Sequence, residues 1–211
     1  MGQFSDAVDA ERQGRRDDIE LSYWTIQPNH WTFQNRKVRR WCESWLNGRV
    51  LNACAGKTKL TGGFDVGEIV RNDINPEIDA DTHVDICEIA DHFDAKSFDT
   101  VVFDPPYSEY QSNKHYEGRT VGSAALAKQQ FHELLRPGGR VIQFGYTTTC
   151  MPMELGYTRI SVAVFNTLGQ MHDILGVVDE KPSETDVFVS DFETETTDNY
   201  STDTDRQEAD R

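Results

Sequence analysis

The sequence predicts an α/β fold built on a mostly parallel β-sheet, and two patterns carry this prediction. Short apolar runs of β type alternate with helical or irregular segments along the chain, which is typical of parallel sheets. The last two runs, residues 159–166 and 172–178, are joined by five residues and are therefore expected to pair antiparallel. A chain of 211 residues is long enough for one domain with a sizeable hydrophobic core.

The expected elements follow in a regular order. Residues 34–47 are predicted to form a helix, because apolar side chains recur there at helical spacing, and Gly48 is expected to cap its end. Strands are expected at residues 49–54, 67–72, 82–86, 97–103 and 140–145, with the weakest pattern at 82–86. A second helix, residues 123–135, is expected to stop at Pro137-Gly138-Gly139.

The chain is strongly acidic, with 36 acidic against 21 basic residues and a formal net charge of -15. Residues 180–211 hold 11 acidic and 3 basic residues, a net of -8, and have too few apolar side chains to offset ordering, so we expect a disordered tail. The rest of the chain, residues 1–179, carries the other -7 of net charge, which has two explanations. The protein avoids polyanions, or it comes from a high-salt cytoplasm in which Asp-rich, Lys-poor surfaces are usual. We favour the second, halophilic explanation.

Several classes of protein are excluded. No apolar run approaches the roughly 20 residues that span a bilayer, and the N-terminus lacks a signal-peptide core, so we expect a soluble cytoplasmic protein. No CxxC pair occurs among Cys42, Cys54, Cys87 and Cys150, and we expect neither a zinc site nor disulfides. Residues 1–33, polar and then aromatic-rich, are expected to precede the folded domain at 34–179, and the acidic tail at 180–211 follows it.

Ligands of open parallel sheets bind beyond the carboxyl ends of the strands. The first strand leads into Asn52-Ala53-Cys54-Ala55-Gly56, a turn of small residues that lets the backbone approach a ligand closely. Lys57 and Thr58 follow, but a phosphate-binding P-loop would also need glycine at position 51, where the chain has leucine.

Acidic residues follow the next two expected strands. Asp73 lies 17 residues beyond Gly56, which suits an acid that accepts hydrogen bonds from ribose hydroxyls and is equally compatible with a local Asx-Pro turn. Asp85 can accept a hydrogen bond from an adenine amino group while Ile86 packs on the ring. A solvated surface carboxylate is the alternative for Asp85.

The fourth strand end has the most specific pattern, because Asp104-Pro105-Pro106-Tyr107 directly follows a buried strand. Asp104 can accept a hydrogen bond from an exocyclic amine, and the two prolines make the turn rigid. Tyr107 offers a π-face for a planar base. The alternative, a Pro-Pro turn with a packing tyrosine, leaves the other strand ends unexplained.

Together these motifs resemble the class I S-adenosylmethionine-dependent methyltransferases. The resemblance is to the amino-methyltransferase group marked by Asp, Asn or Ser before Pro-Pro and an aromatic residue. The similarity runs from about Asn47 to Val178, and Asp104 to Tyr107 match the motif in full. Asn52 to Gly56 depart from the usual D-P-F-x-G-x-G. The resemblance implies a Rossmann-like fold: a mostly parallel seven-stranded sheet with a C-terminal antiparallel hairpin and helices on both faces.

The resemblance also implies S-adenosylmethionine as cofactor and assigns the site residues. The catalytic set comprises Asp104, Pro105, Pro106 and Tyr107. The cofactor-binding set comprises Asn52, Ala53, Cys54, Gly56, Asp73, Ile74, Asp85 and Ile86, and Trp31 and Phe33 fit the N-terminal part of the same pocket.

The implied reaction is methyl transfer to an exocyclic amine of a nucleic-acid base, with adenine N6 in DNA favoured. An RNA base (adenine N6 or guanine N2), a protein acceptor and a non-catalytic binding subunit stay open as alternatives. Only 15 residues separate Tyr107 from Ser123, so we expect a short target, a specificity partner protein or structured RNA.

Two basic groups are candidates for phosphate contacts, with a mobile lid and a solvated helix face as the respective alternatives. They are Lys114, His115, Tyr116 and Arg119, and Arg36, Lys37, Arg39 and Arg40.

Overall fold

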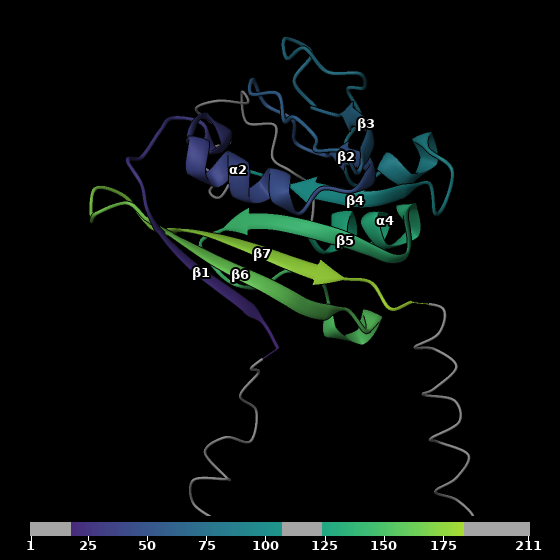
Figure 1. Cartoon of the computed structure of the whole chain (residues 1–211). Helices are drawn as coiled ribbons and strands as arrows, with labels where there is room; N and C mark the ends of the chain where they lie inside the picture. The colour runs from purple at the N-terminus through teal and green to yellow at the C-terminus, as the bar shows by residue number, and fades with distance from the viewer. Residues whose placement is uncertain (1–17, 107–123, 184–211) are drawn as a thin grey trace, which may run out of the picture.

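A computed structural model describes residues 18–106 and 124–183. Its centre is one seven-stranded sheet with the order β1-β6-β7-β5-β4-β2-β3 (Figure 1). The strands are β1 (Glu20–Thr25), β2 (Gly48–Asn52), β3 (Val66–Arg71), β4 (Phe98–Phe103), β5 (Leu135–Gly145), β6 (Thr158–Asn166) and β7 (Ile174–Glu180). β7 is antiparallel to β5 and β6, and the other strand pairs are parallel. The predicted fold class is therefore confirmed.

Helices cover both faces of the sheet because side chains alternate along the central strands. Leu51 and Val101 point to one face, where they join the core beneath helix α4 (Ala124–Leu134). Val50 and Val102 point to the opposite face and join the core beneath helix α2 (Arg36–Ser44). Both strands are thus buried from two sides, which explains their continuous apolar sequences.

Helix α2 is shorter than the predicted 34–47. The Asn35 side chain accepts hydrogen bonds from the backbone N–H groups of Lys37 and Val38, so the helix begins at Arg36. It ends at Ser44, and Gly48 does not cap it. Gly48 instead opens β2 with a φ of +57°, and a Cβ there would lie 2.2 Å from Asp99 Oδ2. Glycine is needed at this position because the Asp99 carboxylate occupies the space.

The expected strand at residues 82–86 is wrong. Only a single bridge, between Asn72 and Thr82, links this segment to the sheet. Side chains take the backbone N–H groups that a strand ladder would use: Val84 N donates to Asn72 Oδ1, and Cys87 N donates to Asp85 Oδ1.

The seventh strand is β1, which lies inside the segment expected to precede the domain. β1 pairs parallel with β6 at the edge of the sheet, with Tyr23 opposite Val164. Its Leu-Ser-Tyr-Trp-Thr run combines aromatic and β-branched residues that favour strands. The folded sheet therefore includes part of residues 1–33.

β5 begins at Leu135, five residues before the predicted start, and contains Pro137-Gly138-Gly139. The turn residues are accommodated by a register shift opposite Phe98 and Thr100 and by a φ of +74° at Gly138. At the other end of the chain, Lys181 Nζ donates to the carbonyls of His132 and Leu135 at 2.6 and 2.9 Å. Residues 180–183 thus belong to the fold, and the rest of the predicted tail lies outside the described residues. Within residues 18–106 and 124–183, every helix falls short of the length and apolarity that a membrane crossing demands.

Candidate functional site

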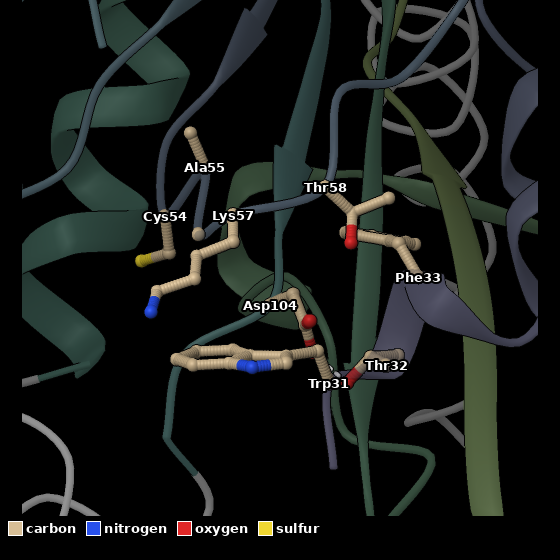
Figure 2. Close-up of a pocket in the computed structure, with 9 residues that line it drawn as sticks. Trp31, Thr32, Phe33, Cys54, Ala55, Lys57, Thr58 and Asp104 are labelled. Carbon is tan, nitrogen blue, oxygen red and sulfur yellow. Dashed lines mark hydrogen bonds between the residues drawn. The ribbon is translucent and has the colours of Figure 1, made fainter. Parts of the chain in front are cut away.

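The carboxyl ends of β2, β3 and β4 meet at one edge of the sheet, because β2 pairs parallel with both neighbours. The segment that joins β1 to α2 crosses this edge. Together they line a small pocket, partly open to solvent, which we call the strand-end pocket (Figure 2). Its lining residues are Trp31, Thr32, Phe33, Cys54, Ala55, Gly56, Lys57, Thr58 and Asp104.

Three consecutive side chains at the end of β3 hold the backbone of the loop that follows β2. Arg71 Nη2 donates to the Gly56 carbonyl at 2.7 Å, and Asn72 Nδ2 donates to the Ala53 carbonyl at 3.1 Å. The Gly56 N–H donates to Asp73 Oδ2 at 2.8 Å. Gly56 has a φ of +54°, a conformation that glycine adopts without strain. The loop is therefore shaped by the neighbouring strand end.

Asp73, the predicted ribose-binding acid, is engaged within the protein. Besides the bond from Gly56, its Oδ1 accepts from the Asn75 N–H at 3.0 Å, so each carboxylate oxygen holds a backbone group. The residue is only 2% exposed. In this conformation Asp73 holds the loop and the local turn together.

Asp104 and Trp31 both line the strand-end pocket (Figure 2). Thr32 Oγ1 donates to Asp104 Oδ1 at 3.3 Å, which links two residues 72 positions apart. The Trp31 ring lies beside Gly56, where an added Cβ would be 3.8 Å from the indole. Lys57 Nζ lies 5.9 Å from the centre of the same ring. The pocket thus presents a carboxylate, an ammonium group and an aromatic ring.

The electrostatics of the site are dominated by carboxylates around Cys54. Burial raises the pKa of the Cys54 thiol well above its ordinary value, and the charges of Asp73, Asp104 and Asp85 raise it further. The thiol is therefore neutral at physiological pH and is a poor nucleophile. Asp73 follows β3, Asp104 follows β4 and Asp85 lies in the irregular 82–86 segment, so acids from three separate segments act on this one side chain.

Asn52 lies at the end of β2 and is fully buried. Among the residues that the structure describes, neither its amide nitrogen nor its amide oxygen has a hydrogen-bond partner. Buried amides are almost always paired, so an orphaned pair of polar atoms directly before a pocket loop indicates a place where a ligand or a water completes the structure.

The other predicted residues lie outside the lining. Pro105 and Pro106 are half-buried immediately beyond Asp104. Ile86 is 5% exposed and packs in the core on the α4 side, whereas Ile74 and Asp85 are half-exposed. Tyr107 and the basic group at residues 114–119 lie outside the described residues.

Sequence reasoning missed six residues of the site. Four of them line the strand-end pocket, namely Thr32, Ala55, Lys57 and Thr58, and the other two, Arg71 and Asn72, shape its loop. A usable signal was present, since Arg71-Asn72-Asp73 is a run of three polar side chains at the end of an apolar strand. In residues 18–106 and 124–183, no group of three or more His, Cys, Asp or Glu side chains is arranged to hold a metal ion.

No protein-family model matches the chain, and no curated protein matches it in sequence. Solved structures do match. The proposed methyltransferase YhhF of Escherichia coli superposes with a TM-score of 0.50 at 9% identity, over 72% of this chain and 88% of that one. The 1,6-didemethyltoxoflavin-N1-methyltransferase of Burkholderia thailandensis, solved with bound 1,6-didemethyltoxoflavin and S-adenosylhomocysteine, gives a TM-score of 0.48 at 15% identity, over 85% of this chain and 87% of that one. The chain therefore has a fold of the class I methyltransferase type.

Proposed function

We propose that this protein is an S-adenosylmethionine-dependent methyltransferase whose acceptor is an exocyclic amine of a nucleic-acid base, with adenine N6 in DNA favoured. One observation carries the proposal: the Asp104 carboxylate of an Asp-Pro-Pro-Tyr sequence lines the same pocket as the Gly56 loop. In a methyltransferase-like fold, this places an acceptor for an amine beside the expected cofactor loop.

The residues present fit the cofactor in two respects. The orphaned amide of Asn52 offers a donor and an acceptor that nothing in the described chain uses. The carboxylate of Asp104 lines the pocket and favours a positively charged ligand over an anion. S-adenosylmethionine supplies a methyl group on a positively charged sulfur. Asn52, the Gly56 loop and Asp85 would hold it, while Asp73 keeps the loop in shape.

Asp104 has the central role in the proposed reaction. Its carboxylate accepts a hydrogen bond from the NH₂ group and thereby directs the nitrogen lone pair outward. Pro105 and Pro106 fix the turn so that backbone carbonyls face the same amine, and Tyr107 is expected to support the base. No side chain with a shifted pKa is needed as a base, because the rate comes mainly from orientation of the reacting atoms.

The polymer contact is proposed for the first turns of α2. Arg36, Lys37 and Arg40 are exposed there, directly after the 3₁₀ helix η1 (Thr32–Gln34), which borders the pocket. The first turn of α2 holds no acidic residue. Cations at a helix N-terminus oppose the helix dipole by about 0.3–1 kcal/mol each, so helix stability does not account for them. Contact with phosphates flanking the target base would account for Arg36 and Arg40, whereas Lys37 Nζ also donates to the Thr25 carbonyl at 2.6 Å.

The test compares Asp104→Ala with Asp94→Ala, which removes an exposed carboxylate outside the site. Wild type and both variants are incubated in molar salt with labelled S-adenosylmethionine and with DNA, RNA or protein pools. Labelled nucleic acid is then digested to nucleosides. We expect label in N6-methyladenine from DNA, lost in Asp104→Ala and kept in Asp94→Ala. Binding of S-adenosylhomocysteine should be equal in all three proteins.

The same experiment separates the alternatives. Label in RNA or protein instead of DNA would replace the acceptor and keep the enzyme class. Cofactor binding without transfer to any pool would indicate a non-catalytic binding subunit. Turnover that survives Asp104→Ala while cofactor binding is lost would reverse the roles that we assign.

A further inference from the structure

We propose that Asn72 is a positioning residue that sets the Gly56 loop and the Asp85 segment in register with each other, so that one cofactor can contact both. This inference rests on the proposed function. Nothing in the sequence motifs marks Asn72, which precedes the predicted ribose-binding acid.

The Asn72 side chain uses its whole hydrogen-bonding capacity. Its Nδ2 group donates to the carbonyls of Ala53 at 3.1 Å and Val84 at 3.0 Å. Its Oδ1 accepts from Thr82 Oγ1 at 2.8 Å and from the Val84 N–H at 3.0 Å. A carboxamide offers two donors and two acceptor lone pairs, and here each has a partner.

The location of Asn72 explains why a side chain, and not a strand ladder, joins the two segments. The backbone of Asn72 is also bonded to the β2 end, since its N–H donates to the Asn52 carbonyl and its carbonyl accepts from the Ala55 N–H. On its other side, the backbone pairing of Asn72 with the 82–86 segment is limited to an isolated bridge at Thr82. The amide therefore replaces the missing strand ladder.

The consequence is a connection between two parts of the expected cofactor site. Asn72 contacts Ala53, in the loop after β2, and Val84, one residue before Asp85. The residue is fully buried, so water cannot take over a lost hydrogen bond. If the carboxamide is changed, the hydrogen bonds that hold the loop and the Asp85 segment in a fixed relative position are lost.

The discriminating variant is Asn72→Asp, which keeps the size and both acceptors but removes the donors to Ala53 and Val84. Asn75→Asp is the matched control, because Asn75 Oδ1 only accepts from the Glu77 N–H, and a carboxylate preserves that bond. We expect S-adenosylhomocysteine to bind Asn72→Asp at least tenfold more weakly by calorimetry in molar salt, and Asn75→Asp within twofold of wild type. Turnover at saturating S-adenosylmethionine should fall less than twofold in Asn72→Asp. A loss of folded protein would instead lower turnover at every cofactor concentration.

Hydrogen exchange of the full-length proteins without ligand separates this inference from the proposed function. Residues 53–58 and 82–88 should exchange faster together in Asn72→Asp, with β5 to β7 unchanged. If wild type binds no S-adenosylhomocysteine, the proposed cofactor is wrong, and the exchange pattern alone then supports or overturns the connection. Unchanged exchange in either segment, or unchanged affinity in Asn72→Asp when wild type binds, overturns the role of Asn72.

Discussion

Replacing Asp73 by asparagine tests whether this acid holds the pocket loop, as the structure indicates. Its two carboxylate oxygens accept from two different backbone groups, Gly56 N–H at 2.8 Å and Asn75 N–H at 3.0 Å. Asparagine has nearly the same shape but only one oxygen. In Asp73→Asn, one of these two N–H groups must therefore face the NH₂ group of the new amide.

The cost follows from the burial of the site. With Asp73 only 2% exposed, water cannot satisfy the N–H group that is left over. An unsatisfied buried donor costs about 1–3 kcal/mol. For a protein of this size each kcal/mol corresponds to about 2–4 °C in Tm, so we expect a loss of about 2–12 °C.

Asp81→Asn is the control with the same chemistry. Asp81 is exposed and accepts from the Arg71 N–H through Oδ2 alone, and an asparagine oxygen can keep that bond. We expect the free energy of unfolding of Asp81→Asn to stay within about 0.5 kcal/mol of the wild-type value, as for ordinary surface substitutions. Urea unfolding at fixed molar salt, followed by tryptophan fluorescence, measures both variants. Equal midpoints for Asp73→Asn and Asp81→Asn would refute the loop-holding role, and a loss of cofactor affinity alone would favour direct contact with the ligand.

Three further outcomes are expected. Gly176→Ala places a Cβ 2.4 Å from Trp41 and should cost about 1–3 kcal/mol of stability. In Gly67→Ala the new Cβ lies 3.9 Å from the Gly48 carbonyl oxygen and should show no such steric cost, so equal unfolding midpoints of the two variants would contradict this packing. Burial raises the pKa of Asp99, but the hydrogen bonds from Arg136 and from the Arg49 N–H outweigh it and lower that pKa below the ordinary value. The stability that Asp99 adds is thus present above about pH 4 and lost as pH falls through its lowered pKa, so wild type and Asp99→Asn should converge in acid titrations of stability. Finally, both folding and turnover should improve as KCl rises to molar concentration, and an optimum at low ionic strength would rule out the halophilic explanation of the acidic surface.

β2 and β4 were predictable because their side chains are apolar on both faces and polar residues stand at their carboxyl ends. β2, β3 and β4 begin and end within two residues of the expected positions. The errors fall where local pattern and tertiary contact disagree. The 82–86 segment has a strand-like sequence, yet the Asn72 side chain takes its backbone groups. β1 was not predicted because an edge strand exposed on both faces shows no clear alternation.

Sequence alone determined which residues stand at the carboxyl ends of the strands, among them Gly56, Asp73 and Asp104, because apolar runs and turn residues leave a local signature. Tertiary structure decided how these residues meet their partners. Thr32 reaches Asp104 across 72 positions, and the orphaned amide of Asn52 is recognisable only once its surroundings are known. Side-chain contacts of this kind depend on how distant strands and loops pack, and no short-range pattern encodes them.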